Sequence, residues 1–279
     1  MNAGRAGPAG PDRREETSAE LDRISAFVES FQDRCAKRST AFQWGTALWH
    51  DDFPLIWDLN FLRVERSDGD LSARRLADTA EELQGQAGLE HRKIEVGDAL
   101  IAGRVGPGFD ELGWSSESLV TMVHRRRPHR SVDTSFVTEV GLDELAPGLA
   151  KLVRTMPYGN DAEVVRQLVE RAAVTEQAIS VRHFAILVEG EPVSFCDLYL
   201  GEGIGQIEDV GTLEEQRGRG FATAVVSKAL ADSFANGSDL TFLVADAEDW
   251  PKELYRKLGF DEVTTSHSFL KLPSDGAGR

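Results

Sequence analysis

Two arginines and two glycines alternate in Arg217–Ala222 (RGRGFA), a combination that could hold an anion. Because glycine has no Cβ, the backbone there can turn several N–H groups toward one phosphate, and the arginines add positive charge. An apolar strand-like run over 205–213 precedes this segment, and apolar residues at helical spacing follow over 221–234. The N-terminus of such a helix favours negative charge. The pattern predicts a phosphate cradle or, as the simpler alternative, a tight strand-to-helix turn.

A second pattern lies further along the chain. The continuous apolar run 240–245 predicts a buried strand, and the segment 251–258 predicts a short helix after it. Pro251 suits the first turn of that helix, and Gly259 suits its C-terminal cap. The sequence therefore predicts, in order, a strand, the candidate cradle, a helix, a buried strand and a second helix.

With both patterns in this order, residues 183–272 resemble the GNAT acetyltransferase superfamily. The phosphate loop of that family has the form Gln/Arg-x-x-Gly-x-Gly/Ala, and its later helix often ends in Leu-Tyr-x-x-Leu-Gly-Phe. The matching residues are Arg217, Gly220 and Ala222 in the loop and Leu254, Tyr255, Leu258, Gly259 and Phe260 at the helix end. The resemblance implies a mixed α/β (α+β) sheet protein with the GNAT acyl-CoA N-acyltransferase fold. It covers 131–272 well and 40–125 weakly.

The resemblance implies acetyl-CoA, or another acyl-CoA, as the acyl donor. The implied enzyme is an N-acetyltransferase that moves the acetyl group to a primary amine of a small molecule or peptide by direct attack through a tetrahedral intermediate. A noncatalytic acyl-CoA-binding or regulatory protein is the alternative. The residues implied to bind the donor are Val210, Thr212, Arg217, Gly218, Arg219, Gly220, Phe221, Ala222 and Glu248.

Three of these residues have open alternatives. Val210 is also an ordinary core residue, and Arg219 is also an ordinary solvated charge. Glu248 departs from the family pattern, which often has Asn there. A carboxylate at this position accepts a hydrogen bond from a pantetheine amide but donates none to its carbonyl.

The resemblance also implies roles in catalysis. Tyr255 is the candidate general acid for the departing thiolate, and a core tyrosine satisfied by a backbone carbonyl is the alternative. The backbone N–H of Val210 is the candidate oxyanion donor. Glu208 and Asp209 are adjacent, so on a regular strand they point to opposite faces. We expect Glu208 to be the base and Asp209 to be structural, with deprotonation through water as the alternative to Glu208.

The two halves of the chain align without a gap at an offset of 151. Ile56, Asp58 and Leu62 fall on Ile207, Asp209 and Leu213, and Gly108–Glu111 falls on Gly259–Glu262. This indicates a tandem of related lobes. At this offset Asp68 and Asp70 stand where the second lobe has Arg219 and Phe221, and carboxylates repel a pyrophosphate. We therefore expect only the second lobe to bind the donor.

The expected organisation has a disordered N-terminus at 1–18, a degenerate, truncated GNAT-like lobe at 19–125, a basic linker at 126–131, a GNAT domain at 132–273 and a tail at 274–279. The expected helices are 19–37, 73–88, 142–155 and 161–173, besides those already named. The expected strands are 40–49, 54–64, 132–140, a hairpin of 183–188 with 191–200, and terminal strands after 260.

Composition narrows the class of protein. The formal net charge of −16 over 279 residues argues against nucleic acid and favours cationic small molecules or basic peptides, although solubility alone explains such a charge equally well. No apolar run is long enough for a membrane span, and the N-terminus lacks a signal-peptide core, so we expect a cytoplasmic protein. Neither the two cysteines nor the six scattered histidines have metal-ligand spacing, so no metal is expected. A homodimer is left open.

Overall fold

A computed structural model describes residues 11–273 of the chain. Its helices are α1 (Pro11–Cys35), α2 (Ala73–Gln86), α3 (Ala99–Glu111), α4 (Leu142–Val153), α5 (Ala162–Ala178), α6 (Phe221–Ala235) and α7 (Pro251–Leu258). Short 3₁₀ turns span Trp57–Leu59 and Glu214–Gln216. Within these residues, no helix is both long and apolar enough to cross a bilayer.

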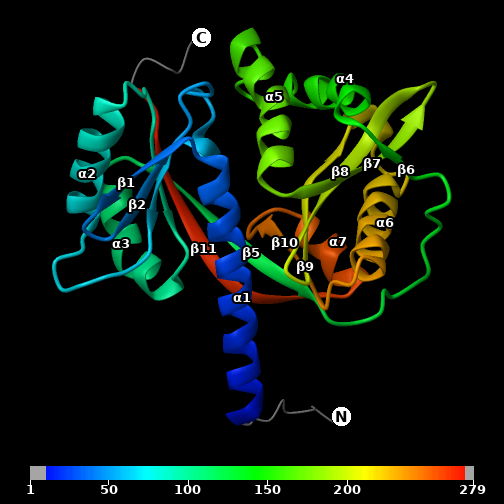
Figure 1. The fold of residues 1–279 in the computed structure, drawn as a ribbon, viewed down its shortest axis with the longest axis horizontal. Helices are drawn as coiled ribbons and strands as arrows, with labels where there is room; N and C mark the ends of the chain where they lie inside the picture. Colours follow the sequence, from blue (N-terminus) through cyan, green and yellow to red (C-terminus); the bar gives the residue numbers. More distant parts are fainter. Residues whose placement is uncertain (1–10, 274–279) are drawn as a thin grey trace.

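The strands form one mixed sheet that runs through both halves of the molecule (Figure 1). They are β1 (Arg38–Phe42), β2 (Gly45–Trp49), β3 (Phe61–Val64), β4 (Arg92–Val96), β5 (Ser115–His124), β6 (Thr138–Val140), β7 (Ser180–Val188), β8 (Glu191–Gly201), β9 (Ile204–Thr212), β10 (Leu240–Asp246) and β11 (Phe260–Lys271). Their order across the sheet is β1-β2-β3-β4-β11-β5-β10-β9-β8-β7-β6. The mixed α/β fold class expected from the sequence is confirmed.

The two lobes exchange strands at the middle of the sheet. β5, from the first half of the chain, pairs with β10 of the second half, while β11, from the second half, pairs with β4 of the first. β5 and β11 also pair with each other, antiparallel, over nearly their whole length. Because each lobe needs a strand from the other to complete its part of the sheet, neither has a complete sheet alone.

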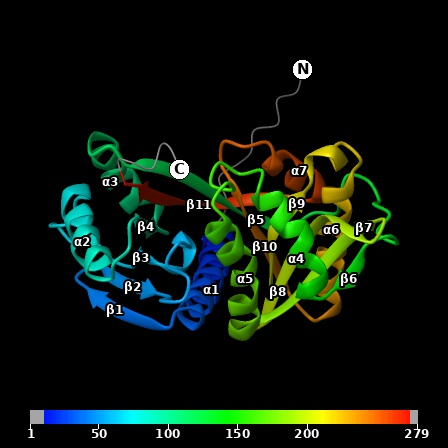
Figure 2. The same ribbon diagram turned by 90° about the horizontal axis from the view of Figure 1, so that it is seen from above.

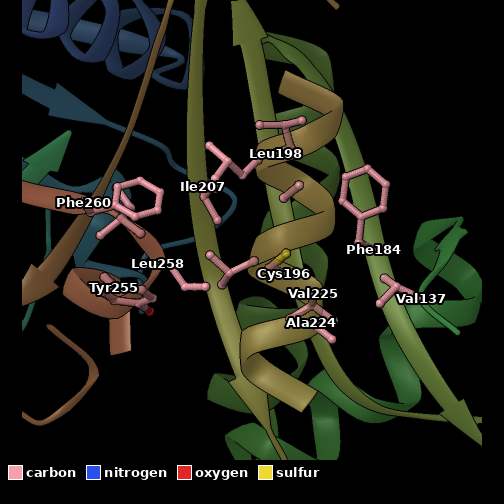
Figure 3. Close-up of a cluster of buried hydrophobic side chains, with 14 of the residues drawn as sticks. Val137, Phe184, Cys196, Leu198, Ile207, Ala224, Val225, Tyr255, Leu258 and Phe260 are labelled. Atoms are coloured by element: carbon pink, nitrogen blue, oxygen red, sulfur yellow. The ribbon is translucent and has the colours of Figure 1, made fainter. Parts of the chain in front are cut away.

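Each lobe has its own hydrophobic core on one side of the sheet. In the second lobe, α6 and α7 pack on residues such as Ile207, Leu198 and Phe184 (Figure 3). In the first lobe, α2 and α3 pack on Leu62, Ile94 and neighbouring residues. The opposite side of the central strands is covered by α1, which lies between the lobes in Figures 1 and 2 and buries Ile24 and Phe27 there.

Several local predictions are confirmed. α2, α6, β10 and α7 lie where the sequence placed them, and Gly259 caps α7 in the left-handed conformation with φ 100°. β7 and β8 form the expected hairpin, in which Glu189 (φ 54°) and Gly190 (φ 83°) make the turn. Two successive left-handed residues are the requirement of a tight two-residue hairpin turn.

Other boundaries were wrong. The segment 40–49, predicted as one strand, is part of the hairpin of β1 and β2, because the chain turns between Phe42 and Gly45. Of 54–64 only β3 is a strand, since 57–59 forms a 3₁₀ turn, and of 132–140 only β6 is a strand. The terminal strands are one long strand, β11. α1 starts at Pro11, so residues 11–18 are helical and only 1–10 of the segment expected to be disordered lie outside the described residues, as does the tail 274–279.

The repeat is present in the topology but not as a gap-free register. In both lobes a parallel strand pair, β3–β4 or β9–β10, is connected through a helix on the core side. An offset of 151 would place Gly69 at the N-cap of α2 as the equivalent of Gly220. The residue at that N-cap is Ser72, so the strand ends Val64 and Thr212 and the two N-caps correspond at an offset of 148 (220 − 72) and not of 151.

Candidate active site

The N-terminus of α6 is open. Gly220 is its N-cap with φ 81° and ψ 8°, and Gly218 has φ 76°, a conformation that side-chain-bearing residues rarely adopt. No side chain caps the helix. Within the described part of the chain, the N–H groups of residues 218–223 have no hydrogen-bond acceptor. Unpaired N–H groups at the positive end of a 15-residue helix form a place for an anion.

The two arginines of this loop have different surroundings. The Nε of Arg217 donates to the carbonyl oxygen of Thr212 at 3.3 Å, so Arg217 ties the loop to the end of β9. Arg219 is exposed and has no ion-pair or hydrogen-bond partner among residues 11–273. Arg219 is therefore the side chain that is free to approach a phosphate.

The equivalent helix end in the first lobe is closed. The Oγ of Ser72 accepts from the N–H of Arg75 at 3.4 Å, which caps α2 with the protein's own side chain. The Asp68 carboxylate accepts from Trp44 Nε1 at 2.9 Å and from the N–H of Asp70 at 2.9 Å. A hollow of about 420 Å³ adjoins this end of α2. The capped N-terminus of α2 and the acidic loop before it are consistent with the expectation that the first lobe binds no donor.

β9 and β10 separate beside the cradle. Their parallel pairing covers only Ile204–Ile207 with Leu240–Leu243, although β9 continues to Thr212 and β10 to Asp246. The far side of β9 carries a bulge, because Asp197 and Phe195 of β8 pair with Glu208 and Gly211 and leave the two residues between without partners. The backbone of β9 after Ile207 therefore faces a gap in the sheet.

Tyr255 lies on the core side of this gap. It is 6% exposed and packs near Phe260, with ring centroids 6.3 Å apart. In Figure 3, Tyr255 and Leu258 lie on one side of β9 and Ala224 of α6 lies on the other. The Tyr255 hydroxyl makes no hydrogen bond to any described residue, so it lacks the carbonyl partner that the alternative of a satisfied core tyrosine expects. Burial first, and then the nearby Glu208, raise the pKa of Tyr255, which keeps the phenol protonated at neutral pH.

Glu208 lies on the opposite side of the sheet from Tyr255. Its cross-strand partner is Asp197, and its carboxylate accepts from Gln206 Nε2. Burial, and next the charge of Asp209, raise the pKa of Glu208 to about 8, while the hydrogen bond from Gln206 acts in the other direction. A half-buried carboxyl with such a pKa is suited to accept a proton near neutral pH.

Asp209 does not point away from Glu208 as a regular strand would require. It has φ 50° within the bulge, so the alternation of side chains is interrupted. Its carboxylate accepts from Arg171 Nη2 at 2.9 Å and from the Tyr199 hydroxyl at 3.4 Å. Tyr199 pairs with Gln206 across the strands, which places Asp209 on the same face as Glu208.

The structural role expected for Asp209 agrees with its contacts. Arg171 of α5 also lies 3.6 Å from Asp58, the residue aligned with Asp209 in the first lobe, and Asp58 pairs with Lys93 as well. Lys93 first and then Arg171 lower the pKa of Asp58 to about 2. One guanidinium thus connects the bulge of the second lobe to the 3₁₀ turn of the first.

The remaining donor-binding candidates are placed as follows. Val210 lies in the bulge without a register partner and packs at the edge of the second-lobe core. Phe221 and Ala222 begin α6. The Thr212 carbonyl is occupied by Arg217, and its hydroxyl lies 2.8 Å from that of Ser194. Glu248 is exposed in the loop before α7, where its N–H donates to Asp246, and its carboxylate makes no hydrogen bond or ion pair with the cradle in residues 11–273.

Two buried residues beside the site were missed from the sequence. His183 Nδ1 lies 2.7 Å from Asp197 Oδ1, and Nε2 lies 3.2 Å from Glu176. Burial raises the pKa of Asp197 to about 6 against the opposing effect of His183. His183 and Asp197 are direct partners in the hairpin. Counting back from the expected turn at Glu189 and Gly190 already brings His183 within one residue of Asp197, and this was the available signal. Among residues 11–273, no group of His, Cys, Asp and Glu is arranged to hold a metal ion.

Comparisons with known proteins agree with this geometry. Residues 187–269 match the family described as FR47-like protein. A GCN5-related N-acetyltransferase from Kribbella flavida superposes with a TM-score of 0.57 and 16% identity, over 94% of this chain and 97% of its own. The chain has a GNAT fold. A tandem GNAT protein from the clavulanic acid biosynthesis pathway superposes with a TM-score of 0.51 and 16% identity over 85% of this chain and 82% of its own, so the two-lobed arrangement is shared.

One further structural neighbour is a protein of unknown function. A functionally unknown conserved protein from Staphylococcus epidermidis superposes with a TM-score of 0.62 and 16% identity, over 84% of this chain and 92% of its own. No curated protein matches the chain. At these identities the likeness establishes the GNAT fold, and the chemistry must be argued from the residues of the site.

Proposed function

We propose that this protein is an N-acyltransferase that moves the acetyl group of acetyl-CoA to a primary amine of a small molecule or peptide. The observation that carries the proposal is the uncapped N-terminus of α6, with Gly218 and Gly220 in left-handed conformations, directly beside the gap between β9 and β10. The cradle suits a pyrophosphate and the gap suits an extended chain. GNAT-fold acetyltransferases combine these two features.

The residues present fit a CoA thioester. The N–H groups of 218–223 and the side chain of Arg219 would hold the pyrophosphate, and the backbone of Val210 would hydrogen-bond the pantetheine arm. When bound, acetyl-CoA supplies an activated acyl group and a thiolate leaving group. A Cβ at Gly220 would meet no atom within 4 Å, so the glycine is required for its φ and not for lack of space.

Tyr255 and Glu208 approach the gap from the two sides of the sheet. On β9, Ile207 belongs to the core under α6 and α7, whereas Gln206 and Glu208 face α1 and α5. The buried, protonated Tyr255 is placed to give a proton on the α7 side, and Glu208 is placed to take one on the other. The donor would therefore enter from the α6–α7 side and the acceptor amine from the α1–α5 side.

The test is release of free CoA thiol from acetyl-CoA with a panel of primary amines, with detection of the acetylated amine by mass spectrometry. We expect amine-dependent thiol release by the wild-type protein and none by Gly220→Asp. The noncatalytic alternative predicts CoA binding by calorimetry with no amine-dependent thiol release by any amine. That outcome would reject the proposed activity while keeping the cradle.

A further inference from the structure

The face of the sheet that carries Glu208 is lined by carboxylates from both lobes. Ser268 of β11 pairs with Glu95 of β4 on one side and with Glu117 of β5 on the other, so these three side chains share a face. Asp246 of β10 pairs with Leu119, two residues from Glu117 on β5, and lies on that face too. We call the set Glu95, Glu117, Glu208, Asp209, Asp246 and Asp58 the acidic face.

The cations at this face are already paired. Lys93 pairs with Asp58 and, at 3.2 Å, with Glu95. Arg171 pairs with Asp209 and Asp58. In residues 11–273 no cationic side chain pairs with Glu117, Glu208 or Asp246, the three remaining carboxylates of the acidic face. Glu117 and Asp246 therefore carry negative charge that no described cationic side chain pairs with, whereas Glu208 is largely protonated at neutral pH because its pKa is raised to about 8.

Gln206 gives a second and independent sign of a ligand. It is 6% exposed and lies on the same face as Glu208, to which its Nε2 donates. Its Oε1 is fully buried and has no hydrogen-bond partner in the described residues. A buried amide oxygen without a donor costs about 1–3 kcal/mol, so this position lacks an N–H or O–H group. A donor that also pairs with the adjacent carboxylate is most simply an ammonium or amine.

Two aromatic rings stand at the first-lobe end of this face. Trp57, next to Asp58, meets Tyr158 edge to face with ring centroids 6.0 Å apart, and 39% of Tyr158 is exposed. Burial first and then the charge of Asp58 raise the pKa of Tyr158. Aromatic rings next to carboxylates suit the methylene chain and the charge of an alkylammonium ion.

We propose that the acceptor is a small molecule with two or more protonated nitrogens, a diamine or polyamine, one of which is acylated beside Glu208 while another is held by Glu117 and Asp246. The inference rests on the proposed function, because it names the acceptor class of that site. A monoamine of equal length would satisfy Glu208 and leave the other two carboxylates unpaired.

Binding tests the acceptor class independently of turnover. Spermidine, 1,4-diaminobutane and n-butylamine are titrated by calorimetry into the full-length protein saturated with CoA at low salt. We expect affinity to rise from n-butylamine to 1,4-diaminobutane and to fall on addition of salt, since the attraction is screened within about 10 Å at 0.1 M. Equal or undetectable binding of all three amines would overturn the inference.

Matched variants locate the binding. Glu117→Gln should weaken 1,4-diaminobutane about threefold or more, the loss expected for one partly exposed charge at close range, and should leave n-butylamine unchanged. Glu82→Gln, the same change on an exposed position of α2, is the control and should change neither. Equal effects of Glu117→Gln on both amines would place the second nitrogen elsewhere and contradict the proposal.

Turnover separates this inference from the proposed function. Preference for the diamine in thiol release supports both, and equal use of mono- and diamines keeps the acyltransferase but rejects the acidic face as its acceptor site. If the diamine binds but no acetyl group is transferred, the proposed acyltransferase activity is rejected and the diamine site at the acidic face is retained. If a lysine-containing peptide binds in preference to every small amine, the small-molecule class is wrong.

Discussion

The guanidinium of Arg171 lies 2.9 Å from the carboxylate of Asp209, the left-handed residue of the β9 bulge. The contact fixes the point where the strand departs from regular pairing. Asp58 of the first lobe shares the same guanidinium at 3.6 Å. The shape of the candidate active site thus depends on a charge supplied by α5 and shared between lobes.

Replacement of Arg171 should destabilise the protein and disturb the bulge. Arg171→Leu removes a guanidinium whose side chain is 24% exposed and leaves the exposed carboxylates of Asp58 and Asp209 without this partner, so we expect a loss of about 1–2 kcal/mol in denaturant unfolding. Arg166→Leu, on the same helix, removes exposed pairs with Glu163 and Glu170 and should cost less than about 1 kcal/mol. Equal losses in the two variants would mean that Arg171 is another surface charge.

The Glu208 carboxyl should make stability depend on pH. Its pKa is raised to about 8 in the folded protein, so the folded state holds a proton that the unfolded chain releases near its usual pKa of about 4.3. Stability from this group is complete at low pH and is lost as pH rises toward and through 8. The wild-type midpoint of thermal unfolding should fall relative to that of Glu208→Gln between pH 5 and 9. Parallel pH curves would show that Glu208 titrates normally.

Gly220→Asp should abolish CoA binding without unfolding the protein. The new carboxylate would both cap α6, as Ser72 caps α2, and repel the pyrophosphate, so we expect affinity to fall by about 10²-fold or more. Gly69→Asp makes the same change in the first lobe, where a Cβ meets no atom within 4 Å, and should leave affinity unchanged. Calorimetry should show one CoA per chain. If the wild-type protein bound two CoA molecules and Gly69→Asp bound only one, a CoA site would lie in the first lobe.

Tyr255→Phe should separate chemistry from stability. The hydroxyl has no hydrogen bond within the described residues, so its removal should leave the unfolding midpoint nearly unchanged. If it protonates the thiolate, turnover with saturating substrates should fall by about 10²-fold while acetyl-CoA affinity stays the same. Full turnover in Tyr255→Phe, with chemistry limiting the rate, would remove Tyr255 from the mechanism.

The local parts of the site could be predicted from the sequence. Gly218 and Gly220 permit the left-handed backbone of the cradle, and Gly259 marks the end of α7, because these are properties of single residues beside apolar patterns. The exchange of β5 and β11 could not be predicted, since an apolar strand carries no mark of which neighbour it pairs with. Nor could the bulge, because left-handed Asp209 contacts Arg171, which lies 38 residues away in the sequence.

The central claim is acyl transfer at the gap between β9 and β10, and a single-turnover experiment tests it most directly. Full-length protein in excess over acetyl-CoA, labelled in the acetyl group, is mixed with 1,4-diaminobutane and quenched over time. We predict that the label appears on the amine, without labelled protein, far faster than in Gly220→Asp or in buffer. Label that stays on CoA at the buffer rate, with CoA bound, would contradict the account.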